Sequence, residues 1–115
     1  MSNGGEELPL EIDVRAVDAM RARGEDFVLL DVREQEEYDL VHIEGARLTP
    51  MSQIQARLEE LKPLREKPIV VHCHHGGRSE QVTHWLRANG FTHVQNMAGG
   101  IDAWAAEVDP SLPRY

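Results

Sequence analysis

The chain has 115 residues, of which 41% are hydrophobic and 28% are charged. This length and balance fit one small globular domain and exclude wholesale disorder. Twelve lysines and arginines against twenty acidic residues give a formal charge of −8, which disfavours nucleic acid and anionic membrane surfaces as partners. The only cysteine excludes an intramolecular disulfide, and no apolar run is long enough to span a bilayer. We therefore expect a cytoplasmic protein.

Hydrophobic periodicity predicts five helices that alternate with three strands. Residues 1–9 are expected to form a flexible lead-in without a signal peptide, and residues 10–115 a single domain. Asp13 is a suitable N-cap for the first helix, Pro63 closes the third, and Ser79 caps the fourth. The expected helices are 13–24, 34–40, 51–61, 79–90 and 101–108, and the expected strands are 27–30, 69–73 and 93–96.

The predicted strand over residues 27–30 is a continuous apolar run, and such runs suit parallel strands covered by helices on both faces. Strands that alternate with helices at this pitch predict an α/β fold with a parallel sheet. Trp85 and Trp104 fall on apolar helix stripes and are expected in the core.

The segment 70–79 carries the chemistry, because a buried strand ends there at the only cysteine, Cys73. Ligands of open α/β sheets bind at the carboxyl ends of the strands. Gly76 and Gly77 allow the next turn to present backbone N–H groups inward, and such a nest at a helix N-terminus binds anions. The same field stabilises a thiolate, so we expect Cys73 to have a depressed pKa, to be nucleophilic and to be open to water. Arg78 either binds an anion or braces the loop through a carboxylate.

Three histidines surround the cysteine. His74 and His75 either line the loop and bind an anionic donor when protonated, or are simply exposed. His72 is expected to be packed under a helix and neutral. Neighbouring strand residues point to opposite faces, so His72 and Cys73 should not converge on one ion, and neither a metal nor another cofactor is expected.

Charged residues after the first strand also leave two interpretations open. Asp31 and Arg33 either border the pocket or support the structure as an ion pair. The acidic run that follows is either a solvated face or a docking site for a basic partner. It consists of Glu34, Glu36, Glu37 and Asp39.

Three segments resemble signatures of the single-domain rhodaneses, members of the sulfurtransferase superfamily. Residues 30–46 are similar to D-V-R-x-x-x-E-Y followed by G-H-I-P-G-A, although Val41 and Glu44 stand where glycine and proline are usual. Residues 73–79 resemble the active loop of this family. Residues 90–104, with Gly-Phe, Ala-Gly-Gly and a tryptophan, resemble its closing signature.

The resemblance implies a rhodanese-like single domain with a central, mainly parallel five-stranded sheet and helices on both faces. It also implies that Cys73 is catalytic and that the loop after it binds the substrate. The loop residues are His74, His75, Gly76, Gly77, Arg78 and Ser79. The spacing Cys-x4-Arg resembles the sulfurtransferases, whereas related phosphatases and arsenate reductases use Cys-x5-Arg and form a lower-ranked alternative.

The implied reaction is thiosulfate:cyanide sulfur transfer. Cys73 takes a sulfane sulfur from thiosulfate or polysulfide as a persulfide and passes it to cyanide, a thiol or an acceptor protein. The alternative is a sulfur-relay module, because residues 99–115 look like the end of rhodanese domains fused to adenylyltransferases. Such a module would serve a cysteine desulfurase or a ubiquitin-like sulfur carrier in cofactor or tRNA thiolation.

Overall fold

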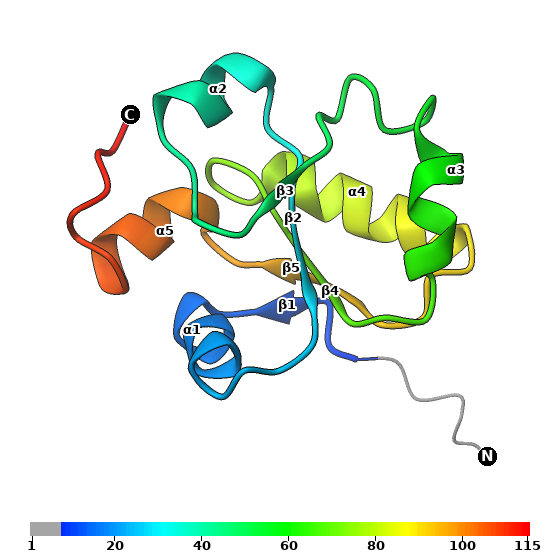
Figure 1. The fold of residues 1–115 in the computed structure, drawn as a ribbon, viewed down its shortest axis with the longest axis horizontal. Helices are drawn as coiled ribbons and strands as arrows, with labels where there is room; N and C mark the ends of the chain where they lie inside the picture. Colours follow the sequence, from blue (N-terminus) through cyan, green and yellow to red (C-terminus); the bar gives the residue numbers. More distant parts are fainter. Residues whose placement is uncertain (1–7) are drawn as a thin grey trace.

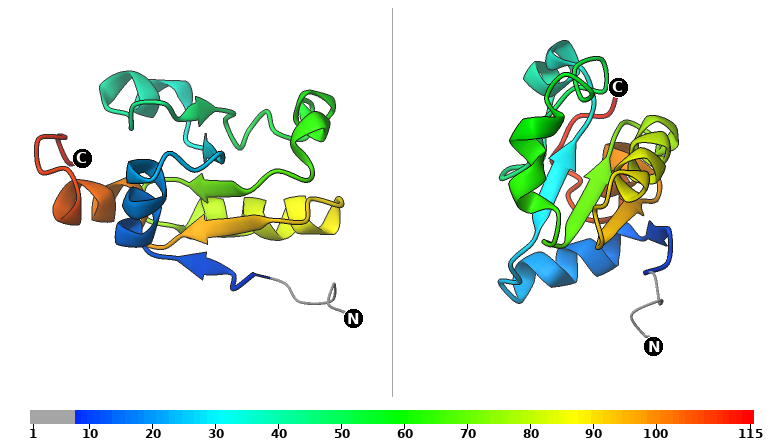
Figure 2. Two further views of the ribbon diagram at one scale, coloured as in Figure 1. Left: turned by 60° about the horizontal axis from the view of Figure 1, so that its bottom comes forward. Right: turned by 90° about the vertical axis from the view of Figure 1, so that its right-hand side faces the viewer.

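The computed structural model describes residues 8–115, so the expected lead-in lies largely outside the described residues. A five-stranded sheet with the order β1-β5-β4-β2-β3 forms the centre of the molecule (Figure 1). Every neighbouring pair of strands is parallel, and the arrows of β1, β4 and β5 point the same way in the left view of Figure 2. The strands are β1 Glu11–Ile12, β2 Val28–Asp31, β3 Arg47–Leu48, β4 Ile69–His72 and β5 Val94–Met97. The predicted α/β fold with a parallel sheet is confirmed.

Helices cover both faces of the sheet. α1 (Val14–Ala22) and α5 (Gly100–Glu107) pack on one face, and α3 (Leu58–Leu61) and α4 (Gly77–Ala88) pack on the other (Figure 1). α2 (Gln35–Leu40) follows the carboxyl end of β2. Among residues 8–115, the structure holds no helix long and apolar enough to cross a membrane.

Two aliphatic clusters hold these layers together. Val71 of β4 packs with α3 and α4, whereas its neighbour Val70 packs with α1 and α5. Successive strand residues point to opposite faces, so a strand covered on both sides is apolar at every position. This arrangement explains why β4 is a continuous apolar run.

The expected helix over 51–61 is the main difference between prediction and structure. Residues 51–57 form successive turns, and only Leu58–Leu61 is α-helical before a short 3₁₀ helix, η1, over Lys62–Leu64. Most backbone bonds in the turns join residues three apart, which gives tighter turns than an α-helix. Glu34 accepts hydrogen bonds from the backbone and hydroxyl of Ser52, so a distant segment holds the start of these turns.

Candidate active site

The loop between β4 and α4 turns sharply at Gly76. Cys73 follows β4 directly, and Gly76 has a φ of +117°, a left-handed conformation that favours glycine. α4 begins at Gly77, so the prediction that Ser79 caps this helix is wrong. Because the left-handed turn starts the helix earlier, Ser79 lies buried in the first turn, with its hydroxyl directed toward the sulfur of Cys73.

Hydrogen-bond donors converge on the sulfur of Cys73. Its Sγ accepts from the backbone N–H of Gly76 at 3.1 Å, from that of Ser79 at 3.4 Å and from the Ser79 hydroxyl at 3.3 Å. Burial raises the pKa of the Cys73 thiol, but these bonds and one from the His75 amide outweigh it. The net pKa of Cys73 is below its usual value, in the direction predicted from the loop.

The thiol is more enclosed than the sequence predicts. Cys73 is only 1% exposed, so the expected opening to water is not what the structure shows. The side chain turns under α4 and joins the same apolar cluster as Val71 and Val82. The sulfur is therefore shielded from solvent in this structure.

Arg78 braces the loop through a carboxylate, one of its two predicted roles. Its Nη1 lies 2.6 Å from Oε1 of Glu37, and its Nη2 lies 3.0 Å from Oε2. The hydrogen bonds from Arg78 lower the pKa of Glu37 to about 2, and the same pairing raises the pKa of Arg78. A solvated face was one interpretation of the acidic run, but Glu37 is instead paired with Arg78 of the loop. In the sequence, only the place of Glu37 in the D-V-R-x-x-x-E signature distinguished it from the other residues of the acidic run.

Asp31 and Arg33 form an ion pair that is completely buried. The Nε of Arg33 donates to Oδ1 of Asp31 at 3.0 Å, and its Nη2 donates to Oδ2 at 2.7 Å. Arg33 also donates to the carbonyl of Val41 at 2.7 Å and to the hydroxyl of Tyr115 at 2.9 Å. Burial lowers the pKa of Arg33, but its hydrogen bonds with Asp31 and Tyr115 raise the pKa by more than burial lowers it. The pKa of Arg33 is therefore above its ordinary value. These contacts are those of structural support, the second of the two interpretations.

The three histidines occupy different environments. His72 is fully buried, and burial lowers its pKa, so the ring is neutral at pH 7 as expected. The side chain of His75 is 68% exposed. His74 lies between them in exposure, with its ring stacked on His75 at 3.8 Å and on Tyr115 at 3.9 Å. Burial, followed by the charge of His75, lowers the pKa of His74, which disfavours a protonated anion-binding ring there.

Two polar side chains that the sequence analysis did not single out also support the loop. The side-chain amide of Asn96, in β5, donates to the Gly76 carbonyl at 3.2 Å. The Oδ1 of Asn96 is a second acceptor for the Ser79 hydroxyl, whose single proton is directed either to Oδ1 or to the Cys73 sulfur. Asp102, in α5, offers a ligand atom near those of His74 and His75, all within 4.8 Å of one another. Both carboxylate oxygens of Asp102 accept from Arg114, so an ion would have to compete with that pair, and we assign no metal role.

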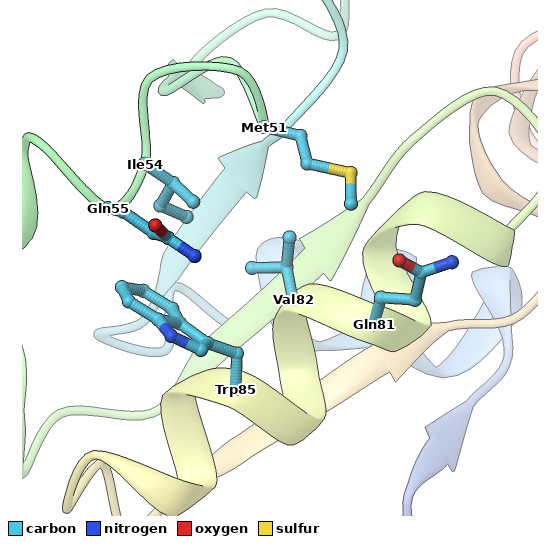
Figure 3. Close-up of a pocket in the computed structure, with 6 residues that line it drawn as sticks. All are labelled: Met51, Ile54, Gln55, Gln81, Val82 and Trp85. Atoms are coloured by element: carbon cyan, nitrogen blue, oxygen red, sulfur yellow. The ribbon is translucent and has the colours of Figure 1, made fainter.

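A separate groove of about 250 Å³ lies between the turns over 51–57 and α4 (Figure 3). Trp85 lines it, facing Ile54 and Gln55 in Figure 3. Trp85 is therefore half-buried rather than part of a closed core, whereas Trp104 is buried as expected. The lining residues are Met51, Ile54, Gln55, Gln81, Val82 and Trp85, which include none of the predicted site residues.

Curated relatives of this chain include sulfurtransferases. The thiosulfate sulfurtransferase GlpE of Coxiella burnetii is 38% identical over 81 residues, which cover 70% of this chain and 74% of that protein. The adenylyltransferase and sulfurtransferase MOCS3 of Arabidopsis thaliana is 33% identical over 105 residues, which cover 79% of this chain and 23% of that protein. The match spans only 30% of another Arabidopsis relative, rhodanese-like/PpiC domain-containing protein 12, which is 40% identical over 89 residues.

Solved structures and a family model agree with these relatives. A rhodanese-like domain protein from Staphylococcus aureus has a TM-score of 0.78 at 27% identity, covering 93% of this chain and 99% of that chain. The human single-domain sulfurtransferase TSTD1 has a TM-score of 0.77 at 26% identity, covering 87% and 98%. The family model described as a rhodanese-like domain matches residues 13–107. With the parallel sheet and its cysteine loop, this match shows that the chain belongs to the rhodanese-like domain family.

Proposed function

We propose that this protein is a sulfurtransferase that carries a sulfane sulfur on Cys73 as a persulfide. The proposal depends on the hydrogen bonds that Gly76 and Ser79 direct onto the Cys73 sulfur. Donors fixed in this way stabilise a thiolate and then the negative outer sulfur of a persulfide. The similarity to GlpE and TSTD1, which are both named as sulfurtransferases, supports the same reaction class. A free thiol of this kind also favours a reducing compartment, such as the cytoplasm.

The reaction proceeds in two balanced steps when thiosulfate is the donor and cyanide the acceptor. The Cys73 thiolate attacks the outer sulfur, a new S–S bond forms, and the S–S bond of thiosulfate breaks as sulfite leaves with the electron pair. The cyanide carbon then attacks the outer sulfur of the persulfide. Thiocyanate leaves, and Cys73 returns to its thiolate.

The loop residues His74, His75, Gly76, Gly77, Arg78 and Ser79 form the proposed substrate-binding site. Gly76 and Ser79 supply donors to the sulfur, while Arg78 holds the loop against Glu37. We do not propose a phosphatase, because the six-residue loop is one residue shorter than that class uses and the relatives described above are named for sulfur transfer.

Mass spectrometry of the intact protein tests the proposal. After incubation with thiosulfate, the wild type is expected to gain the mass of one sulfur atom on Cys73, and cyanide is expected to remove it as thiocyanate. Cys73→Ser should gain no sulfur and should lose at least about 10³-fold in transfer rate, because the nucleophile is absent. A wild type that gains no sulfur from thiosulfate, polysulfide or a cysteine persulfide would contradict the proposal.

A sulfur-relay role is the second candidate, supported by two observations. The relative MOCS3 is named as both an adenylyltransferase and a sulfurtransferase, and so is MoeZ of Mycobacterium tuberculosis at 35% identity. In addition, Arg78 and Arg114 beside the loop are each paired with a carboxylate, so their charge is largely neutralised toward a free dianion such as thiosulfate. A protein donor or acceptor would depend less on unpaired cations.

Sulfur loading from two donors distinguishes these roles. The rate of Cys73 persulfide formation is measured with thiosulfate, and separately with cysteine plus a purified cysteine desulfurase. Faster loading from the desulfurase at equal sulfur supply favours the relay. Faster loading from thiosulfate favours the small-molecule enzyme.

A further inference from the structure

Asn96 connects the sheet to the first turn of α4, beside the cysteine loop. In the sheet it is paired with Glu11 of β1 on one side and with Val71 of β4 on the other. Side chains of residues that are directly opposite each other in neighbouring strands lie on the same face, and Val71 faces α4. Asn96, which is 1% exposed, therefore reaches Ser79 from the sheet.

The orientation of the Asn96 amide is fixed by groups that can only accept hydrogen bonds. Its Nδ2 donates to Oε2 of Glu11 at 2.7 Å and to the Gly76 carbonyl at 3.2 Å. A carboxylate and a carbonyl have no proton to donate, so the NH₂ end of the amide faces them. The acceptor end, Oδ1, consequently faces the Ser79 hydroxyl.

The Ser79 hydroxyl has one proton and several acceptors. Its Oγ lies 2.5 Å from Oδ1 of Asn96, 3.2 Å from the Gly76 carbonyl oxygen and 3.3 Å from Sγ of Cys73. The Gly76 carbonyl already accepts from the Glu80 amide at 3.0 Å and from Asn96, and these two bonds occupy its two lone pairs. Oδ1 of Asn96 and the sulfur therefore compete for the hydroxyl proton.

We infer that Asn96 is a positioning residue of the proposed sulfur-transfer site, which accepts the hydrogen bond of the Ser79 hydroxyl while Cys73 is a thiol and yields it to the sulfur when Cys73 becomes a thiolate. The hydroxyl keeps its own proton, and the thiol proton passes to water. The role in catalysis rests on the proposed function, whereas the change of hydrogen-bond acceptor can be measured without sulfur transfer.

The physical reason for this change lies in the different acceptor strengths of the two groups. A neutral thiol is a weak acceptor, so the Ser79 hydroxyl donates to Oδ1 of Asn96. A hydrogen bond to a charged sulfur is stronger, so the hydroxyl turns toward the thiolate. The buried hydroxyl thus has a partner in both states of Cys73, and no unpaired donor opposes the ionisation.

Charged and titratable side chains also surround the loop. They are Glu11 of β1, Glu37 of α2, His72 of β4, Arg78 of α4, and His74 and His75 of the loop itself. Arg78 interacts with the charge of Cys73 while it pairs with Glu37. The substitutions Asn96→Leu and Ser79→Ala replace neutral side chains, so they leave all of these charged groups in place.

Titration of Cys73 by the ultraviolet absorbance of its thiolate tests the inference, with Cys73→Ser as the blank because the chain has no other cysteine. Absorbance measures ionisation without a reagent that must reach the buried sulfur. Asn96→Leu removes Oδ1 with little change in side-chain volume. Gln95→Leu is the matched control, because Gln95 lies in the same strand, donates to the Pro9 carbonyl at 3.0 Å, and points to the opposite face from Asn96.

Asn96→Leu is expected to raise the ratio of thiolate to thiol at a fixed pH about three- to tenfold, because the thiol state loses a hydrogen bond that the thiolate state does not use. A merely structural Asn96 would give the opposite sign, since a loosened loop would take its N–H donors away from the sulfur. Ser79→Ala should lower the ratio about threefold or more. In the Ser79→Ala background, Asn96→Leu should change the ratio by less than about twofold, because the shared hydroxyl is absent.

The pH profile of Cys73 alkylation by neutral iodoacetamide provides a second measure of the same ionisation. Thermal denaturation establishes that each variant is folded, and Asn96→Ala replaces Asn96→Leu if the latter is not. An unchanged or lower ratio in the folded Asn96 variant would overturn the inference. An equal rise in Gln95→Leu or in the Ser79→Ala background would also overturn it. Failure of the wild type to accept sulfur would overturn the proposed function alone.

Discussion

Glu37 receives hydrogen bonds from three different parts of the chain. Arg78 donates to both of its carboxylate oxygens, the hydroxyl of Tyr115 donates to Oε2, and the backbone amide of Glu34 donates to Oε1. Each donor favours the ionised carboxylate over the protonated one. The single side chain thus links α2, the cysteine loop and the segment after α5.

The Glu37 carboxylate makes stability depend on pH in a defined window. Its pKa is about 2 in the folded protein against 4.5 for the ordinary side chain, with the Arg78 bonds as the main cause. Because the folded pKa is the lower one, the stabilisation is fully present above pH 4.5 and is lost as the pH falls toward 2. Glu37→Gln is expected to lower the free energy of unfolding at neutral pH by ~1–2 kcal/mol, allowing for solvent screening.

Urea denaturation of the wild type and Glu37→Gln at neutral pH and at about pH 3 measures this effect, and the difference should shrink at the lower pH. Glu36→Gln, at an exposed neighbour, serves as the control and should leave stability at neutral pH within about 0.5 kcal/mol. A difference for Glu37→Gln that stays constant across the two pH values would contradict the linkage.

At the scale of elements, the start of α5 lies directly against the cysteine loop. Gly100 has a φ of +60°, and a Cβ placed on it would be 2.5 Å from the carbonyl oxygens of Cys73 and His74. This close approach allows the first amides of α5 to bond to those two carbonyls. The second glycine of the Ala-Gly-Gly signature therefore lets α5 hold the backbone of the loop.

Gly100→Ala is expected to displace the loop. Gly24→Ala is the matched control, since Gly24 has a φ of +69° but open space where the Cβ would lie. The control should cost ~1–2 kcal/mol from the left-handed backbone alone, whereas Gly100→Ala adds a steric cost of about 1–3 kcal/mol. Gly100→Ala should also slow sulfur loading of Cys73, because the donors to Sγ shift. Equal destabilisation of the two variants by urea denaturation would show that the loop is not crowded by this residue.

At the scale of the whole molecule, net charge affects the choice of donor. The formal charge of −8 opposes the approach of thiosulfate, which is a dianion. We expect kcat/KM for thiosulfate to rise about twofold or more between about 0.01 M and 0.15 M ionic strength, as the Debye length falls from about 30 to 8 Å. The alkylation rate with neutral iodoacetamide should stay nearly constant over the same range. A decrease with salt for thiosulfate would show instead that the loop presents a positive field.

Local sequence determined the fold class and the place of the chemistry. The predicted strands that correspond to β2, β4 and β5 are separated by helices, and this pattern alone predicted a parallel α/β sheet, which is confirmed. The strands β1 and β3 have two residues each, too short for a periodic signal, so the expectation of five strands came from the family resemblance, and their order came from the structure. The glycines after Cys73 marked the tight loop, because their conformational freedom is a property of the residue itself.

Only the tertiary structure decided which distant groups meet at that loop. The carboxylate of Glu37 lies 41 positions from Arg78 in sequence, and Tyr115 lies 78 positions from Glu37, so no local pattern predicts either contact. The 1% exposure of Cys73 likewise depends on how α4 packs over the sheet. Hydrophobic patterning and glycine placement act over a few residues, whereas burial, ion pairing and access depend on the packing of separate segments, and these complete the site.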